Sequence, residues 1–330
     1  MAAMETLVLM EEPAALTAVK ALLRAKESVD AGVTTVRDLG GRDYVEFSVR
    51  RAITDGLSSG PRIVAAGRPV CMTGGHGCFI GREADGPDDV RKAVREQLKA
   101  GADVIKLIAT GGVMTPGVEP GSPQLTLEEM RAAVEEAGRA GRLTAAHAQG
   151  SAGIADAVEA GITTIEHGIF LTDEIIESMK RKGVFLVPTL AAPAAISAGG
   201  LAAGIPEFMV RKSDAVMPHH VASFQRAAKA GVRIAAGADS GTPLNLHGSL
   251  LPELELMVKY GMTPLEVIRS ATSVAAEALG LGGETGRVAD GYAADLLAVA
   301  GEPGERIGAL GDVRLVLAQG RAVVNRLTPR

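Results

Sequence analysis

The sequence is poor in aromatic residues and cysteines, and it has no long hydrophobic run. Tryptophan is absent and aromatic residues make up 3% of the 330 residues, so a buried core has to be built from Ala, Val, Leu and Ile. No apolar stretch reaches the roughly 20 residues that a transmembrane helix needs, so we expect no membrane partner. The formal net charge is −5 and no basic cluster stands out, which argues against a nucleic-acid partner.

The two cysteines, Cys71 and Cys78, are too few for a disulfide scaffold and indicate a reduced, cytoplasmic protein. A disulfide that closes the loop between them is the less favoured alternative. The segment Met1–Pro13 lacks a basic stretch ahead of an apolar one, so it does not resemble a signal peptide. The length suits a single α/β barrel, and the 41 glycines and 47% hydrophobic residues indicate a large core with many tight turns.

One pattern recurs along the chain. A helix-like segment ends in Gly, a short apolar strand follows, and a polar residue lies at the far end of that strand. Gly suits the left-handed position just past a helix. The apolar runs lack a regular polar alternation, as expected for parallel strands buried on both faces. The instances begin at Gly32, Gly101, Gly141, Gly161, Gly183 and Gly231.

The segments between these strands carry signals for helix starts. Thr126 with Glu129 predicts a capping box, and so does Thr263 with Glu266. Residues 88–100 are amphipathic, with acidic residues early and Lys late, as the helix dipole favours. Helices that alternate with strands predict a parallel sheet.

Seven strands are predicted, one fewer than a closed barrel of eight. We therefore expect an α/β fold of the (β/α)₈ TIM-like barrel type that lacks its first strand, and an open doubly wound sheet is the alternative. The barrel is favoured because polar residues cluster at the carboxyl ends of the strands, where barrel enzymes place their chemistry. The predicted strands cover residues 34–39, 61–70, 103–110, 143–149, 163–169, 184–190 and 233–239.

The sequence pattern changes after Leu281, from alternating helices and strands to short strands separated by Gly turns, and this change divides the chain. Residues 1–280 form the predicted barrel domain. Residues 281–330 are predicted to form short antiparallel strands with Gly turns, the remnant of a small β-sandwich domain. These strands are too few to form a core alone, and we find no partner strands for them elsewhere in the chain.

Lys106 lies inside the apolar strand VIKLI, where a lysine is seldom buried without a role. The alternative is a lysine that reaches the barrel mouth or pairs with an acid. Burial lowers the pKa of a lysine, so more of it is the neutral amine, which can react with carbon dioxide to form a carbamate. A carbamate has two oxygens and could bridge two metal ions.

His147 and His167 end successive strands, each six residues past its Gly. Matched positions bring both imidazoles to one mouth, which suits Zn²⁺ or a similar divalent ion, whereas a single His is more often structural. Asp239 ends the last predicted strand, where it could ligate metal and take a proton from bound water. Its alternative role is to cap the loop that follows.

Lys, His, His and Asp at four strand ends, in that order, make the chain resemble the amidohydrolase superfamily. The closer likeness is to its imidazolonepropionase-like and Xaa-Pro dipeptidase-like branch, and it covers nearly the whole chain. The matching stretches are AGVTTVRDLGG (31–41), TGGHG (73–77), VIKLIATGGV (104–113), AAHAQG (145–150), TIEHG (164–168), VPTL (187–190) and AAGADSGTP (235–243).

The resemblance implies a role for each of these residues. Lys106 would be a carbamylated ligand that bridges two metals, and His147 and His167 would hold the second metal. Asp239 would bind the first metal and act as general base. His76, in the TGGHG loop, would contact substrate, and its alternative is an ordinary loop residue. The implied cofactor is one or two divalent ions, Zn²⁺ foremost, and the implied reaction is attack of a metal-activated hydroxide on an amide or ester carbonyl.

The chain departs from this family at one point. The family places a His-x-His pair at the end of its first strand, upstream of AGVTTVRD, and no His-x-His occurs here. The chain therefore resembles a family member without its first ~60 residues, a figure inferred from the usual span of a barrel. His219 and His220 are adjacent and do not share a helix face, so they are poor substitutes. For them, and for His247, surface or capping roles are favoured.

The leading hypothesis is a hydrolase of an amide, peptide-like bond, such as that of an Xaa-Pro dipeptide or an N-acyl amino acid. The absent His-x-His motivates a second, a catalytically impaired protein that binds one metal or none. A lactonase, esterase or deaminase on the same scaffold is the third, and Lys106 argues against the deaminase. We expect loops 111–125 and 191–218 to line the mouth around a small-molecule substrate, and exposed strand edges favour a homo-oligomer. Candidate cations for a substrate carboxylate are Arg68, Arg82, Arg211 and Lys212.

Overall fold

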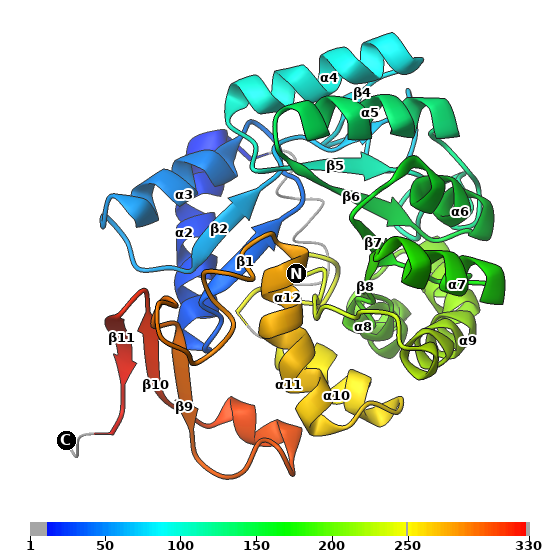
Figure 1. The fold of residues 1–330 in the computed structure, drawn as a ribbon. Coiled ribbons are helices and arrows are strands. Elements are labelled where there is room, and N and C mark those ends of the chain that lie inside the picture. The colour runs from blue at the N-terminus through cyan, green and yellow to red at the C-terminus, as the bar shows by residue number, and fades with distance from the viewer. Residues whose placement is uncertain (1–11, 249, 328–330) are drawn as a thin grey trace.

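The computed structural model describes residues 12–248 and 250–327 (Figure 1). The expectation for the segment Met1–Pro13 falls almost entirely outside the described residues. Strands and helices alternate along most of the chain, and the strands lie in an arc with helices on its outer side (Figure 1). Within residues 12–248 and 250–327, no helix is long and apolar enough to cross a membrane.

Two parallel sheets make up the arc, as the alternation of helices and strands predicts. One pairs β1 (Thr35–Asp38) with β2 (Arg62–Ala65), and the other has the strand order β4-β3-β5-β6-β7-β8. The sheets meet where the Asp103 N–H donates to the Ala65 carbonyl over 2.8 Å. The strands of the larger sheet are β3 (Val70–Cys71), β4 (Arg82–Glu83), β5 (Val104–Ile108), β6 (Leu143–Ala148), β7 (Thr164–His167) and β8 (Phe185–Val187).

The helices follow the sequence signals closely. Both predicted capping boxes form, at the starts of α5 and α11. Four helices end at a glycine with a left-handed backbone, as the repeated pattern predicts. The helices are α2 (Ala14–Asp30), α3 (Val45–Thr54), α4 (Pro87–Ala100), α5 (Leu127–Arg139), α6 (Ser151–Ala160), α7 (Asp173–Lys182), α8 (Ala191–Gly199), α9 (Glu207–Ala230), α10 (Leu251–Lys259), α11 (Pro264–Ala271) and α12 (Ser273–Ala278), with short 3₁₀ turns η2 (Leu201–Ala203) and η3 (Ile307–Gly311).

The main core lies between the arc and its outer helices, and it is built from small and aliphatic side chains. Ile105 and Leu107 of β5 and Ile165 of β7 are fully buried in it, together with Ile154 of α6. Strand residues that face outward pack on these helices, while the alternate residues face the inside of the arc. This packing holds the carboxyl ends of β5, β6 and β7 at fixed relative positions.

Two predicted strands are wrong in extent. Residues 61–70 form two strands, because the chain turns at Gly67, whose φ is +74°, before Pro69; β2 ends ahead of the turn and β3 begins after it. The segment 233–239 makes a single ladder bridge, from Ile234 to Leu186 of β8. Beyond that bridge the Ala236 N–H donates to the Ser270 carbonyl rather than to a strand, so the ladder stops there.

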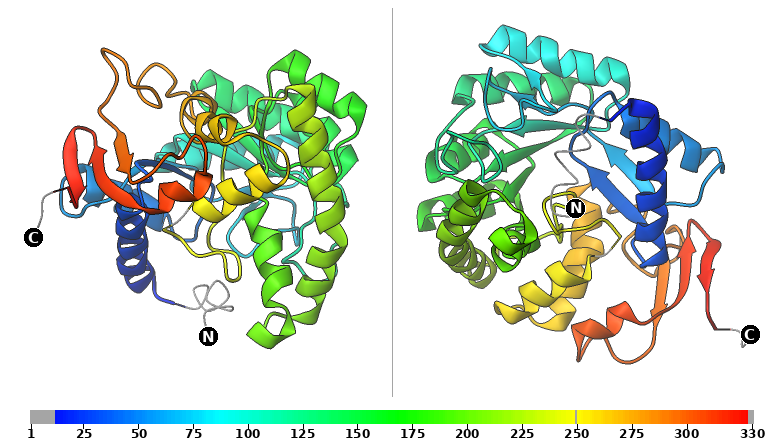
Figure 2. Two further views of the ribbon diagram at one scale, coloured as in Figure 1. Left: turned by 90° about the horizontal axis from the view of Figure 1, so that it is seen from below. Right: turned by 180° about the vertical axis from the view of Figure 1, so that it is seen from behind.

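The segment 191–218, predicted to be a long loop, is largely helical, and this prediction is wrong. Its first part forms α8 and its last part begins α9 (Figure 2). Its many Ala residues favour helix, and Pro206 precedes the first residue of α9, a position where the fixed φ of proline suits a helix start. Pro218 lies inside α9, which runs on to Ala230.

The predicted antiparallel strands after Leu281 are present, and they pair with one another. β9 (Leu296–Val299) and β11 (Arg321–Asn325) flank β10 (Val313–Ala318) in a three-stranded sheet. Its inner face packs on Val29 of α2, which supplies the apolar surface that three strands alone could not provide. As expected, no strand from elsewhere in the described chain pairs with them, and a helix rather than a second sheet completes their core.

Candidate functional site

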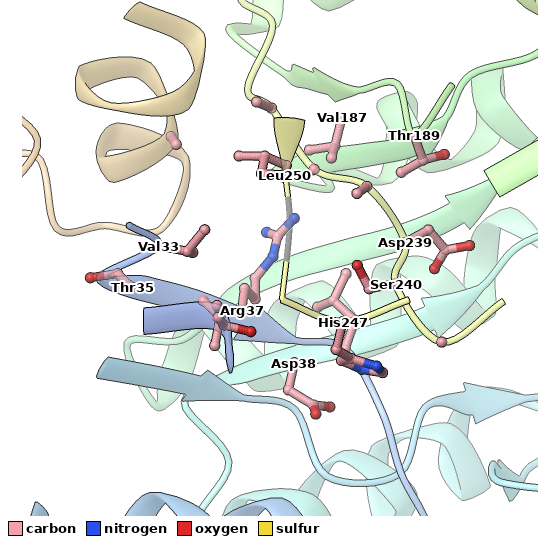
Figure 3. Close-up of a pocket in the computed structure, with 18 of the residues that line it drawn as sticks. Val33, Thr35, Arg37, Asp38, Val187, Thr189, Asp239, Ser240, His247 and Leu250 are labelled. Atoms are coloured by element: carbon pink, nitrogen blue, oxygen red, sulfur yellow. The ribbon is translucent and has the colours of Figure 1, made fainter. Parts of the chain in front are cut away.

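A cavity of about 1230 Å³ runs along the inside of the arc. Each of the five predicted site residues lines it, so the structure brings them together from β5, β6, β7 and two loops. Figure 3 shows Arg37 and Asp38 of β1 on one side of this cavity, with Thr189 and Asp239 across from them. The five predicted residues are His76, Lys106, His147, His167 and Asp239.

The imidazole rings of three of these residues form one cluster. The ring centroid of His147 lies 4.4 Å from that of His76 and 4.5 Å from that of His167. Each ring has one nitrogen held by a neighbour: Nε2 of His147 lies 3.0 Å from the Gly111 carbonyl, and Nδ1 of His167 lies 2.6 Å from Oγ1 of Thr189. Burial lowers the pKa of all three, to about 4 for His76, so the rings are neutral at neutral pH.

Lys106 is buried in β5, with 6% of its surface exposed. Burial lowers the pKa of its amine to about 8, against the opposing effect of Glu166 and Asp239. Asp239 is open to the solvent of the cavity but lies deep within it, so the surrounding protein raises the pKa of its carboxyl to about 6. Its φ is +54°, in the left-handed region that Asp tolerates better than most residues.

Two charged residues beside the site were missed by the sequence analysis. Arg37 of β1 and Glu166 of β7 form a buried ion pair 3.0 Å long, with 10% and 5% of their side chains exposed. Arg37 also donates to Oγ1 of Thr164 over 3.1 Å. Both are charged residues inside predicted strands, a weaker form of the signal given by Lys106, because their strands TVRD and TIEH contain other polar residues.

The remaining histidines behave differently from one another. His219 is exposed, as expected. His220 is buried, so the surface or capping role favoured for it is wrong: its Nε2 lies 2.7 Å from the Pro188 carbonyl and 3.1 Å from the His167 carbonyl. His247 is an exposed loop residue that lines the cavity, next to Asp38 in the view of Figure 3.

The four cations considered for a substrate carboxylate lie outside the cavity lining and are engaged elsewhere. Arg68 donates to backbone carbonyls, and Arg82 forms ion pairs on the outer surface with Asp89 and Glu96. Arg211 lies 3.8 Å from a carboxylate oxygen of Glu119. The fourth, Lys212, donates to backbone carbonyls of loop 111–125.

Among residues 12–248 and 250–327, no three or more His, Cys, Asp or Glu side chains are grouped closely enough to hold a metal ion. The cluster of rings described above is therefore incomplete as a metal site when only these residue types are counted. Lys106 is a different type of residue. It precedes Ile108 of β5 by two positions, and Ile108 pairs with His147 of β6.

The architecture and the cavity define a class of protein. Parallel strands alternate with helices, and the polar side chains gather at the carboxyl ends of the strands, which is the arrangement of α/β enzymes. The chain belongs to the amidohydrolase family, whose model matches residues 2–323. The predicted likeness to the Xaa-Pro dipeptidase-like branch is confirmed by the solved structures that resemble it.

Three proteins illustrate these likenesses. The ochratoxinase of Aspergillus niger is 35% identical over 308 residues, which cover 85% of this chain; the chain spans 62% of that relative's length. A Xaa-Pro dipeptidase with methionine bound in its active site superposes with a TM-score of 0.86 at 35% identity, covering 92% of this chain and 78% of that one. A prolidase complexed with N-methylphosphonate-L-proline gives 0.88 at 34% identity, covering 96% and 82%.

Proposed function

We propose that the chain carries the site of a metal-dependent hydrolase that cleaves an amide, peptide-like bond. The observation that carries the proposal is the pair His147 and His167, two buried imidazoles on neighbouring strands, each oriented by a hydrogen bond at one nitrogen. The relatives named as a prolidase and an Xaa-Pro dipeptidase support an Xaa-Pro dipeptide as the substrate, and we propose an N-acyl amino acid as the alternative.

The donor chemistry of these residues fits a divalent ion, for which we propose Zn²⁺. Nε2 of His147 faces a carbonyl oxygen, so it carries the ring proton and Nδ1 bears the lone pair. When Nδ1 of His167 donates to the Thr189 hydroxyl, Nε2 of that ring bears the lone pair in turn. The neutral amine of Lys106 would add to carbon dioxide, forming an N–C bond and releasing one proton, and the carbamate would supply oxygen ligands. Asp239 would supply another.

The ion, when bound, would polarise the substrate carbonyl and make a water molecule more acidic. The protein's own residues would handle the protons. Asp239, as a carboxylate in the cavity, can accept a proton from the water and then pass it to the leaving amine. The neutral His76 ring, held through Nδ1 by the Thr115 hydroxyl at 2.7 Å, would position the substrate.

The test is metal content by elemental mass spectrometry, together with hydrolysis of a panel of Xaa-Pro dipeptides and N-acyl amino acids. We expect at least one divalent ion per chain, and we expect Lys106→Ala to lose both metal and turnover. Lys182→Ala is the matched control, because Lys182 at the end of α7 forms a part-exposed ion pair with Glu159 of α6, away from the cavity. Full turnover with unchanged metal in Lys106→Ala would refute the assigned role of that lysine.

One observation favours a second candidate function. Because no group of three His, Cys, Asp or Glu side chains forms among residues 12–248 and 250–327, the ligands for a first metal are incomplete there. The second candidate is a catalytically impaired protein that holds one ion weakly. About one ion per chain with no turnover across the panel would select it over the hydrolase.

We further propose how the chain is organised. The arc would belong to a (β/α)₈ barrel whose remaining strand position lies between β1 and residues 233–239, with 1–280 as the barrel domain and 281–330 as a small β-sandwich domain. A homo-oligomer is supported by α2, which exposes 45%, 56% and 59% of three apolar residues spaced along one helix face, Leu16, Val19 and Leu23. Light scattering during size-exclusion chromatography tests it, and a monomer would contradict it.

A further inference from the structure

The chain turns between the end of β8 and the first residue of α8, from Pro188 to Ala191, and this turn is under conformational constraint. Thr189 in this turn has a φ of +55°, which is unfavourable for a β-branched residue. His167, at the end of the neighbouring strand, has a φ of +74°. The two residues face each other, with 2.6 Å between Oγ1 of Thr189 and Nδ1 of His167. Backbone conformations of this kind persist only where the surroundings hold them.

One restraint on the turn comes from α9. His220 is 1% exposed, and its Nε2 lies within hydrogen-bond distance of two carbonyl oxygens, at Pro188 and at His167. Both partners are acceptors, so Nε2 carries the proton and the ring joins the ends of β7 and β8. Its other nitrogen, Nδ1, is buried and has no hydrogen-bond partner in the described part of the chain. An unpaired buried nitrogen costs stability, so packing alone does not account for a histidine here.

A second restraint comes from α10, on the other side of the turn. Glu253 is fully buried, and its two carboxyl oxygens accept the N–H groups of Leu190 at 3.0 Å and Ala191 at 2.7 Å. These N–H groups lie at the start of α8, whose N-cap residue provides no side-chain cap. The carboxyl group thus caps α8 from a distant element and fixes the end of the turn.

We propose that His220 and Glu253 are positioning residues that hold the turn from both sides, so that Thr189 fixes the ring of His167 with Nε2 directed to the cavity. The inference rests on the proposed function in one respect: His167 is taken as a metal ligand. In this arrangement His220 holds the backbone of His167 and Thr189 holds its ring. Loss of the His220 donor would free the turn, and the imidazole would exchange between its tautomers.

The experiment follows the imidazole nitrogens directly, by ¹⁵N–¹H correlation NMR of the intact chain labelled at histidine. In the wild type we expect His167 as a single tautomer, protonated at Nδ1. His220→Leu keeps the volume but loses the donor, and we expect it to give mixed tautomers at His167. His220→Gln, whose amide can donate to the same carbonyls, should restore the single tautomer. His219→Leu, the same change at the exposed neighbour, is the matched control and should behave as the wild type.

Co²⁺ titration of the same four proteins, followed by visible absorption, separates this inference from the proposed function. We expect His220→Leu to bind Co²⁺ at least tenfold more weakly than the wild type, the loss usual when a group that orients a ligand is removed. An unchanged His167 tautomer in a folded His220→Leu protein would overturn the inference, whatever the metal does. A third outcome is also informative: the tautomer of His167 changes in His220→Leu, but no protein, wild type included, binds Co²⁺. That result would support the positioning role and refute the proposed metal site.

Discussion

Replacing Glu46 by Gln should stabilise the protein at pH 8 and change its stability little at pH 5. Glu46 lies in the first turn of α3, with 6% of its surface exposed. Burial, together with the nearby carboxyl of Asp38, raises the pKa of its carboxyl from 4.5 to about 7. Its Oε1 has no hydrogen-bond partner among residues 12–248 and 250–327, and the stabilisation of the carboxylate by Arg50 and by backbone N–H groups is smaller than the cost of burial.

The sign and size of the effect follow from proton linkage. Between pH 4.5 and about 7 the folded protein retains a proton on Glu46 that the unfolded chain has lost. The free energy of unfolding therefore falls as the pH rises through this window, by about 1.4 kcal/mol per pH unit for this group. The total loss is about 3 kcal/mol, complete above pH 7. Glutamine has a similar shape and does not ionise, so the variant avoids this loss.

The assay is urea denaturation of the wild type and Glu46→Gln at pH 5, 6, 7 and 8. We expect the free energies of unfolding to differ by about 1 kcal/mol or less at pH 5 and by about 3 kcal/mol in favour of the variant at pH 8. Glu128→Gln, at an exposed position in the first turn of α5, is the control and should not show the gain of about 3 kcal/mol at pH 8. The reasoning fails if the two curves for Glu46→Gln run parallel.

Three further predictions concern the scaffold. Thr126→Ala should lower the free energy of unfolding by about 1 kcal/mol, since its hydroxyl caps the N–H of Glu129; an unchanged urea midpoint would contradict the assigned cap. Lys212→Met should speed amide hydrogen exchange in loop 111–125, because the ammonium group holds two carbonyls of that loop, and unaltered exchange would show that the loop is held by other contacts. Ile165→Ala should cost 2–5 kcal/mol in the same denaturation assay, because the side chain is fully buried, and a loss below about 1 kcal/mol would mean that the core collapses around the gap.

The strands that carry the site were predictable because each one is a local pattern. A Gly after a helix, a short apolar run and a polar residue at its end located Lys106, His147 and His167 on β5, β6 and β7. The pattern failed at residues 61–70, where a turn at Gly67 interrupts an otherwise strand-like run. It also failed at 233–239, since a strand needs partners on the sheet, and this segment bonds to the Ser270 carbonyl after one bridge.

The residues that support the site could not all be predicted from local patterns. Arg37 and Glu166 could have been, because each is a charged residue inside a predicted strand. His220 could not, since its role depends on carbonyls 32 and 53 residues away along the chain, at Pro188 and His167. Every residue has a backbone carbonyl, so such a hydrogen bond does not require a particular residue type at the accepting position. Only the folded structure therefore identifies the role of His220.

The arc of strands has a mechanical consequence. Between β1 and residues 233–239, no described residue supplies a ladder hydrogen bond, so the arc behaves like an open ring. A closed ring can widen only by breaking backbone hydrogen bonds, whereas an open one can flex at its gap while every ladder stays intact. The separation of Asp38 and Asp239, which lie on different sides of the cavity in Figure 3, can thus change without the loss of a ladder hydrogen bond. A strand bound between β1 and residues 233–239 would fix this separation and, with it, the width of the cavity.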